Sequence, residues 1–551
     1  MKSSLIHLFL AFFVFTAAAQ TNAPAIIPLP QHMDVREGAF VLWPETKILV
    51  NAAAKDTGKF LADRLRASTG YPLPVKVAAH PLGTRTEGTI ILECLHCGAW
   101  TLGAEGYDLR VSSNSVVILA TNQAGLFYGV QTLLQLLPPE ILADKVSVGR
   151  QWTIPRVTII DQPRFAWRGL MLDVSRHFFT KTEVEQILDV MPLYKLNMFH
   201  MHLVDDQGWR IEIKKYPRLT SVGAWRNEIN FTLDPKSSKA WRADGKYGGF
   251  YTQKDIRELV RYAAARHITI VPEIEMPGHS AGALSAYPQY SCTGGPFSRD
   301  KDDAIFCPGN EETYAFLENI LGEVMKLFPG PFVHIGGDEV STADWKKCPK
   351  CQARMKEEGF HDERQLQSYL IQRIEKFVNV HGKRLIGWSE IRKGGLAKNA
   401  AVMDWAGGGA EAASAGHDVV MSPYAPDDFA YLNVYQTLNA GSEPAGEGGF
   451  LPLSKVYRFE PKPKDLAPQF QPHILGGQGN LWTEYVPNLR QAEYMYFPRA
   501  CAMAEVLWSP KDLRNWTNFL ARVKINEQRL EAKGVNYRRD PLNTGEKHLS
   551  Q

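Results

Sequence analysis

Two adjacent carboxylates, Asp338 and Glu339, follow a short apolar run that ends in Gly336-Gly337. Acidic pairs are common on solvated surfaces, but the apolar run predicts a buried strand and the glycines permit close backbone approach. Like charge and partial burial raise the pKa of one carboxyl group, which places a proton donor beside an anion. Glycoside hydrolysis needs this arrangement: an acid for the leaving oxygen and a second group that stabilises the cationic sugar ring.

Other polar and aromatic residues follow further apolar runs of the chain. If these runs are the strands of one (β/α)8 barrel, their carboxyl ends meet at the rim where active sites of such barrels form. In chain order these residues are Arg168, 173–177, His200, His202, Asp205, Asp206, Glu273, Glu275, His279, Trp388, Glu390, Asp404, Trp405, Tyr424, Trp482 and Glu484. So many chemically active groups at one rim are hard to explain by packing alone.

Eight short apolar runs predict the strands that position these groups. They cover residues 169–174, 198–204, 268–274, 332–335, 384–388, 401–405, 418–421 and 473–477. Helical patterns lie between several of them, at 182–196, 253–266, 311–328, 363–380 and 490–507. Continuous apolar strands that alternate with helices indicate a parallel sheet buried on both faces, so the fold class is α/β, a (β/α)8 TIM barrel. The sixth and seventh units are the weakest, because 407–416 leaves little room for a helix, and 441–472 is expected to be a long loop.

A smaller α+β domain is predicted ahead of the barrel, over residues 24–160. Its strands include 107–111 and 115–121, its helices cover 55–68 and 124–137, and an Asp-Gln-Pro turn at 161–163 marks the boundary. The barrel then occupies 161–510, and 511–551 form a C-terminal helical extension.

The first 19 residues are expected to be a signal peptide. Lys2 is followed by an almost wholly apolar stretch at 5–15 and by alanines at 17–19, which suits a cleavage site. This stretch is too short to span a bilayer, and no later stretch approaches the roughly 20 apolar residues that a span needs. The sequence therefore predicts export, to the periplasm or the medium.

Composition narrows the classes of partner. The 62 Lys+Arg nearly balance the 59 Asp+Glu, and no dense basic patch suggests nucleic acid or a membrane surface. A hydrophobic fraction of 44% excludes a disordered chain.

All seven cysteines follow the predicted signal peptide, where disulfides can persist. We expect a bridge between Cys292 and Cys307 that closes a polar loop. The two C-x-x-C pairs, Cys94/Cys97 and Cys348/Cys351, are interpreted as local disulfides, with a joint zinc site as the alternative. Cys501 lies in an apolar helical pattern and is expected to be a buried free thiol.

Four segments together resemble glycoside hydrolase family 20, whose members are β-N-acetylhexosaminidases. They are WRGLMLDVSRH at 167–177, HLVDDQGWR at 202–210, PEIEMPGH at 272–279 and HIGGDE at 334–339. The resemblance covers the whole mature chain and implies a small α+β domain before the barrel. It also implies exo-hydrolysis of terminal β-linked GlcNAc and GalNAc with retention, in which the substrate's own 2-acetamido oxygen attacks the anomeric carbon.

The same resemblance implies roles for individual residues. Glu339 is the general acid, Asp338 holds the acetamido N–H, and the Tyr431 hydroxyl steers the acetamido carbonyl. Asp205 and His279 orient the acid. The residues expected to contact the sugar are Trp388, Trp405 and Trp482 as aromatic walls, and Arg168, Glu484 and Asn433 as partners of ring hydroxyls. Asn433 stands where many relatives have Asp, which leaves open the tolerance at the sugar's 4- and 6-positions.

Neither a cofactor nor a metal is expected at this site, and the partner is an oligosaccharide or glycoconjugate. Chitin oligomers, host glycans and cell-wall fragments all present the same terminal sugar, so the sequence leaves the natural polymer open, as it does the oligomeric state.

Three alternatives compete with this interpretation. A metal-dependent barrel hydrolase could use His200 and His202 with Asp205 and His279, but the further ligands that such sites need are missing. A silent sugar-binding protein is disfavoured by the intact carboxylate pair. A conventional retaining glycosidase would form a covalent glycosyl-enzyme and ignore a thiazoline mimic of the cyclised acetamide.

Overall fold

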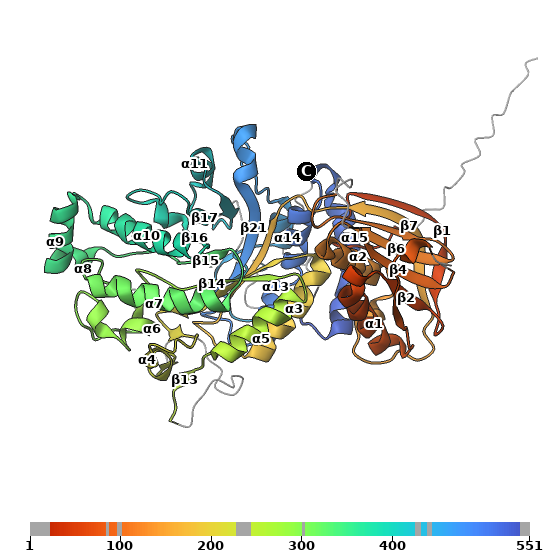
Figure 1. Cartoon of the computed structure of the whole chain (residues 1–551), viewed down its shortest axis with the longest axis horizontal. Helices are drawn as coiled ribbons and strands as arrows, with labels where there is room; N and C mark the ends of the chain where they lie inside the picture. The colour runs from red at the N-terminus through yellow and green to blue at the C-terminus, as the bar shows by residue number, and fades with distance from the viewer. Residues whose placement is uncertain are drawn as a thin grey trace, which may run out of the picture.

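The computed structural model describes residues 23–83, 87–95, 102–227, 244–299, 304–424, 431–437 and 443–539. These residues form an N-terminal α+β domain, at the right of Figure 1, and a closed barrel surrounded by helices. The predicted signal peptide lies outside the described residues. In the described part, no helix is both long and apolar enough to cross a membrane.

The N-terminal domain is a seven-stranded sheet with two helices on one face. The sheet order is β1-β7-β5-β6-β4-β2-β3. Its elements are β1 (His32–Leu42), β2 (Lys47–Val50), α1 (Lys55–Thr69), β3 (Val75–Val77), β4 (Thr89–Cys94), β5 (Tyr107–Val111), β6 (Ser115–Ala120), α2 (Gln123–Leu136) and β7 (Trp152–Asp161). Burial alternates along β6 and most of β7, as expected for strands with one covered face. The predicted strands and helices of this domain are confirmed to within two residues.

Eight parallel strands close the barrel, which confirms the predicted fold class. They are β8 (Trp167–Asp173), β9 (Met198–His202), β14 (Thr269–Glu273), β15 (Phe332–His334), β16 (Arg384–Trp388), β17 (Ala401–Asp404), β18 (Val419–Met421) and β21 (Ile474–Leu481). Each overlaps one of the eight predicted runs. Almost every residue of these strands is buried, because helices cover the outer face and side chains fill the interior.

Three of the helices that surround the barrel begin at capping boxes. Thr180 and Thr252 form capping boxes at the starts of α3 (Lys181–Val190) and α5 (Gln253–Ala264), and Asp362 does so for α10 (Glu363–Val380). The chain continues with α7 (Glu311–Leu327) after β14 and with α13 (Leu489–Tyr496), α14 (Arg499–Trp508) and α15 (Trp516–Lys533) after β21. The single helix predicted at 490–507 is wrong: the chain forms α13 and α14, separated at Pro498, which lacks the N–H that a helix interior needs.

Shorter elements fill the loops. They are β10 (Val204–Asp205), β11 (Gly208–Trp209), α4 (Arg218–Ser221), β12 (Trp225–Arg226), β13 (Tyr247–Gly248), α6 (Ala281–Leu284), α8 (Ala343–Lys347), α9 (Pro349–Glu358), α11 (Gly409–Ser414), β19 (Val434–Tyr435), β20 (Glu447–Phe450) and α12 (Leu453–Arg458). The sixth unit, where the sequence leaves little room for a helix, thus contains a short helix of 6 residues, α11. The expected loop at 441–472 contains β20 and α12.

Helix α15 ties the end of the barrel to the N-terminal domain. The Arg522 guanidinium binds both the Ile26 carbonyl (2.8 Å) and Glu505 of α14, and Arg529 donates to the Gln135 carbonyl (2.6 Å). On the barrel side, Asn526 accepts a hydrogen bond from Tyr194. In Figure 1 this helix lies beside α2.

The cysteine pairing differs from the prediction. Cys292 and Cys307 are not bridged, and neither are Cys348 and Cys351: these four are free thiols gathered in one cluster. Cys94 ends β4 in the other domain, so it does not share a zinc site with Cys348 and Cys351. Cys97 lies outside the described residues, and its local pairing stays a prediction. Cys501 is a buried free thiol in α14, as expected.

Candidate active site

A pocket of about 190 Å³ opens at the carboxyl ends of the barrel strands. Loops after six of the strands, together with Trp388 at the end of β16, contribute to it. The lining residues are Arg176, His279, Asp338, Glu339, Trp388, Trp405, Tyr424, Tyr431, Glu447, Trp482 and Glu484. The rim predicted from the sequence is therefore the rim that carries the pocket.

A tight turn after β15 presents the carboxylate pair to this pocket. Gly336 and Gly337 have φ values of +66° and +94°, and Glu339 itself has φ +46°, which is rare for a residue with a Cβ. The Gly337 N–H donates to the Glu275 carboxylate (2.8 Å), and a Cβ on Gly336 would lie 1.8 Å from that same group. Such backbone strain is typical of functional sites that the surrounding structure holds in place.

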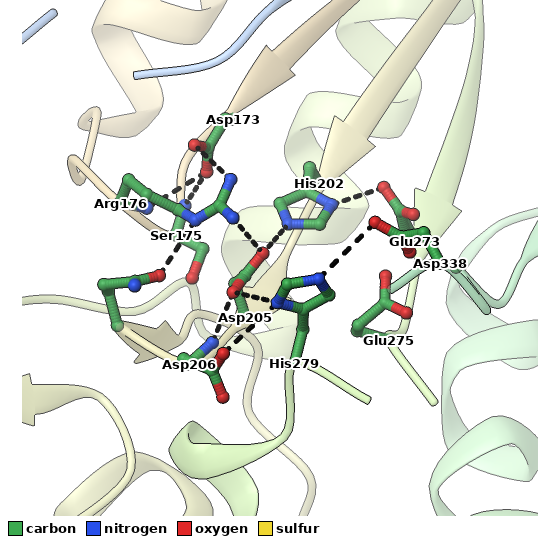
Figure 2. Close-up of polar contacts among 12 residues, drawn as sticks. Asp173, Ser175, Arg176, His202, Asp205, Asp206, Glu273, Glu275, His279 and Asp338 are labelled. Atoms are coloured by element: carbon green, nitrogen blue, oxygen red, sulfur yellow. Dashed lines mark hydrogen bonds and ion pairs between the residues drawn. The ribbon is translucent and has the colours of Figure 1, made fainter. Parts of the chain in front are cut away.

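His279 contacts four carboxylates, of which Figure 2 shows Asp205, Asp206 and Asp338. Its Nδ1 is 3.2 Å from Asp206 and 3.5 Å from Asp205, and its Nε2 is 3.6 Å from Asp338 and 3.5 Å from Glu339. Burial opposes protonation of His279, but the surrounding carboxylates, Asp205 first, outweigh burial and raise its pKa well above the usual value. The imidazolium therefore connects the acidic pair to the carboxylates behind it.

The pKa values of the two carboxyl groups are shifted in opposite directions. Burial raises the pKa of Asp338 to about 6, against the opposing charge of His279. The pKa of Glu339 is lowered, chiefly by its hydrogen bond with His279, and its side chain is 53% exposed. One carboxyl group thus has a raised pKa, as the sequence predicted, but in the open pocket that group is Asp338.

A second polar chain runs from Arg176, which lines the pocket, through Asp205 to His202 and Glu273 behind it (Figure 2). Arg176 is 2.9 Å from Asp205, and His202 places one ring nitrogen 2.7 Å from Asp205 and the other against Glu273. Burial works against the charged imidazole, yet Glu273 and Asp205 raise the pKa of His202 to about 10. Glu273 also accepts a hydrogen bond from Trp388 Nε1 (2.8 Å), which fixes that indole at the pocket floor.

Aromatic rings form the walls. The rings of Trp405 and Tyr431 are stacked, 6.2 Å apart and 10° from parallel, and Trp482 meets Tyr431 edge-on. Trp388 lies 5.7 Å from Trp482. Trp405 Nε1 donates to Glu390 (2.8 Å), so its ring orientation is fixed from outside the pocket. An apolar box with one acidic side can accept both a methyl group and an amide N–H.

Eight of the eleven predicted site residues line the pocket: Asp338, Glu339, His279, Trp388, Trp405, Tyr431, Trp482 and Glu484. Asp205 lies behind the pocket, in contact with His279. Asn433 is buried and donates through Nδ2 to the carboxylate of Glu447, so the pocket-lining group at this point is Glu447.

The assignment of Arg168 to the pocket is wrong. Arg168 is the second residue of β8, so it lies at the amino end of the strand. It is fully buried and forms a bidentate pair with Glu105 of the N-terminal domain (2.8 and 2.9 Å). Arg176, three residues beyond the end of β8, is the arginine that lines the pocket, 3.3 Å from Glu484.

Sequence reasoning missed the roles of two residues. Arg176 lies within the first motif. Only the observed extent of β8 shows that Arg176, and not Arg168, lies at the pocket end of the strand. Glu447 lies in the segment expected to be a long loop, where no neighbouring motif marks it.

The ligands of the alternative metal-dependent hydrolase do not converge. Among the described residues, His200 groups with Glu273 and His334, whereas His279 groups with Asp205 and Asp206. Both ring nitrogens of His202 already contact carboxylates. His202 and His279 share Asp205 as a partner, whereas His200 contacts Glu273, so these side chains do not surround one ion.

The sequence matches two family models. Residues 165–511 match "Glycosyl hydrolase family 20, catalytic domain" and residues 23–162 match "Glycosyl hydrolase family 20, domain 2". Among curated relatives, the beta-hexosaminidase of Porphyromonas gingivalis is 42% identical over 522 residues, which cover 93% of this chain and 64% of that protein. The beta-N-acetylhexosaminidase of Cellulomonas fimi is 33% identical, with 91% and 92% of the two chains covered.

Solved structures have the same architecture. The GH20 beta-N-acetylhexosaminidase of Streptomyces coelicolor superposes with a TM-score of 0.80 at 33% identity, covering 94% of this chain and 98% of that one. The GH20 exo beta-N-acetylglucosaminidase of Vibrio harveyi, in complex with N-acetylglucosamine, superposes with a TM-score of 0.81 at 34% identity, covering 95% and 79%.

Proposed function

The chain belongs to glycosyl hydrolase family 20, and from this we infer that it is an exo-acting β-N-acetylhexosaminidase. It hydrolyses terminal non-reducing β-linked GlcNAc and GalNAc in oligosaccharides or glycoconjugates. The observation that carries the proposal is the Asp338-Glu339 pair on one strained turn, facing a pocket walled by Trp405 and Tyr431. A volume of about 190 Å³ suits a single sugar ring and is below the range of sites that enclose larger ligands, which supports exo cleavage.

Cleavage begins with the substrate's own acetamide. Asp338 accepts a hydrogen bond from the acetamido N–H, and the Tyr431 hydroxyl donates to the acetamido carbonyl, so the carbonyl oxygen is aligned with the anomeric carbon. That oxygen forms a bond to the anomeric carbon while the glycosidic bond breaks and Glu339 gives its proton to the leaving oxygen. Asp338 stabilises the positive charge of the resulting oxazolinium ion.

Water completes the reaction. Glu339, now a carboxylate, takes a proton from a water molecule whose oxygen attacks the anomeric carbon and opens the oxazolinium ring. Two inversions at the same carbon give net retention of configuration.

Glu339 must be protonated when the sugar is bound, although His279 lowers its pKa in the open pocket. The exposed half of its side chain faces the space that the sugar would fill. A bound sugar removes water from this carboxylate, and desolvation disfavours the charged form, so binding raises the pKa of Glu339 toward that of an acid catalyst.

The proposal includes export. A positively charged residue, an apolar stretch and three alanines at the start of the chain support removal of a signal peptide and function outside the cytoplasm.

Aryl β-glycosides test the proposed activity. We expect turnover of the β-GlcNAc and β-GalNAc substrates, little or none of the β-glucoside, and strong inhibition by a thiazoline mimic of the cyclised acetamide. Equal cleavage of the glucoside, or indifference to the thiazoline, would refute attack by the acetamide. Unchanged activity after chelation would dispose of the metal-dependent alternative.

A further inference from the structure

Four cysteines from two neighbouring loops meet beside the active site. Cys292 and Cys307 belong to the segment that follows β14, and Cys348 and Cys351 to the segment that follows β15. Their four sulfur atoms all lie within 4.8 Å of one another. Cys307, Cys348 and Cys351 are buried and Cys292 is partly buried.

The distances among the sulfur atoms fit a shared central ion. The Sγ atom of Cys307 lies 3.6 Å from the Sγ of Cys351 and 3.7 Å from the Sγ of Cys348. The Sγ atoms of Cys292 and Cys351 are 3.6 Å apart. A tetrahedral zinc with Zn–S bonds of about 2.3 Å separates its sulfurs by about 3.8 Å. A disulfide would instead bring one pair to about 2 Å and move it away from the others, whereas Cys307 has two almost equidistant partners.

The surrounding chain is arranged to hold these positions. Cys348-Pro349-Lys350-Cys351 has the C-x-x-C spacing of structural zinc sites and starts α9, whose first-turn N–H groups favour thiolates. The loop after Cys307 packs directly on this turn: a Cβ on Gly309 would lie 2.3 Å from the Lys350 carbonyl carbon and 2.4 Å from the Cys351 nitrogen. Only glycine permits that approach, which places Cys307 beside Cys348 and Cys351.

We propose that Cys292, Cys307, Cys348 and Cys351 bind one Zn²⁺ ion as a structural site with four thiolate ligands. Each thiol loses a proton as its sulfur binds the ion, so four protons are released and the site carries a net charge of −2. All four tetrahedral positions are taken by sulfur, which leaves none for a substrate or water. The zinc therefore has no part in bond cleavage.

The role of the ion is to clamp the two catalytic loops together. The segment after β14 carries His279, and the segment after β15 carries Asp338 and Glu339. Val340, next to Glu339, packs in the same apolar cluster as the cysteines, and Trp345 Nε1 donates to the Phe306 carbonyl (3.0 Å) across the two loops. The zinc acts on catalysis by positioning, through the contact between His279 and Glu339.

Metal content of the full-length protein is the direct test, and it is read without an activity assay. Protein purified under reducing conditions without chelator should contain about one zinc per chain by elemental analysis and by native mass spectrometry. After exchange with Co²⁺, the absorption spectrum should show the intense sulfur-to-metal charge-transfer bands of tetrahedral thiolate coordination.

Matched variants locate the ion. Cys351→Ser should lose most of the zinc, Cys348→His should retain it because three cysteines with one histidine are also a common structural set, and Cys501→Ser, a buried thiol outside the cluster, should be unaffected. Zinc-free wild-type protein, two disulfides among the four cysteines in unreduced peptide maps, or full zinc content in Cys351→Ser would each overturn the proposal. Even if Cys351→Ser fails to fold, the cobalt spectrum of the wild type and the contrast between Cys348→His and Cys348→Ser still decide it.

Discussion

At the scale of single residues, the pocket is organised by the charge of His279. Its imidazolium contacts Asp338 and Glu339 on one side and Asp205 and Asp206 on the other. His279 lowers the pKa of both carboxyl groups, but Asp338, whose side chain is only 14% exposed, has its pKa raised by burial, whereas the pKa of the half-exposed Glu339 stays lowered. The roles of the two carboxylates therefore depend on what the bound sugar covers.

Glu339→Gln removes the proposed acid while keeping its shape. We expect kcat to fall by about 10²–10⁴-fold for substrates with poor leaving groups and much less for aryl glycosides whose leaving group needs no proton. Affinity for a thiazoline inhibitor should change less than kcat, because Asp338 and Tyr431 hold the acetamide. Steady-state kinetics with leaving groups of graded acidity would measure this, and an equal loss for all of them would contradict the role.

The pH dependence of kcat/KM should reflect the ionisation of Asp338. Burial raises its pKa to about 6, so kcat/KM should fall as the pH drops through about 6 and the carboxylate that receives the acetamide N–H is protonated. Asp338→Asn should abolish this acidic limb along with most acetamide-dependent turnover. A wild-type profile that stays flat down to pH 4 would contradict the assignment.

The stability of the folded protein should depend on pH in the opposite direction to kcat/KM. The folded-state pKa of Asp338 lies above its usual value of 3.8, so its contribution to stability is greatest below pH of about 4 and is lost as the pH rises through about 6. Compared with wild type, Asp338→Asn should gain stability between pH 4 and pH 8, by about 2–3 kcal/mol. Thermal unfolding at both pH values gives the measurement.

At the scale of elements, the turn after β15 sets the position of Asp338 and Glu339. Gly336 has φ +66° and leaves no space for a Cβ beside Glu275. Gly336→Ala should therefore displace the acidic pair and lower kcat by about 10²-fold or more, with a stability loss of about 1–2 kcal/mol.

Gly359→Ala is the matched control for that change. Gly359 ends α9 at φ +69° with nothing near the added Cβ, so it carries similar backbone strain at a surface position. We expect a loss of about 1 kcal/mol in stability and unchanged kcat. If both variants lost kcat to a similar degree, backbone strain alone, and not displacement of the acidic pair, would explain the effect at Gly336.

The strands of the barrel could be predicted because each is a continuous apolar run, such as Ala401–Asp404, and burial on both faces produces that pattern. Exact strand ends are less visible in a sequence. Arg168 and Arg176 both adjoin one run, and only the observed extent of β8 places the first at the amino end and the second at the pocket. Cysteine partners are set by loops that meet in three dimensions, so Cys307 could not be assigned to Cys348 and Cys351 from spacing.

At the scale of the whole molecule, the two domains are joined by ion pairs at the amino ends of the barrel strands. Arg168 pairs with Glu105, and Lys195 pairs with Asp161 at 2.9 Å, with no exposed surface on either side chain of the latter pair. Ion pairs of this kind favour one arrangement of the domains, because a shifted interface that kept one partner buried would leave its charge unpaired.

Arg168→Lys tests whether that interface is structural. Lysine keeps the charge but cannot form the bidentate contact with Glu105, so we expect a loss of about 2 kcal/mol in stability with KM and kcat unchanged. Arg176→Lys should show the reverse, with a larger change in kcat/KM than in the unfolding midpoint, because Arg176 lines the pocket. A large increase in KM for Arg168→Lys would restore the role that the sequence first suggested.

The position of α15 has a consequence for biosynthesis. This helix is translated after the rest of the barrel, yet its two arginines bind the carbonyls of Ile26 and Gln135 in the N-terminal domain. The N-terminal domain therefore keeps that surface uncovered until residues 516–533, which form α15, have been translated. A prematurely terminated product would keep this surface exposed, and quality-control proteases could distinguish it from the finished enzyme.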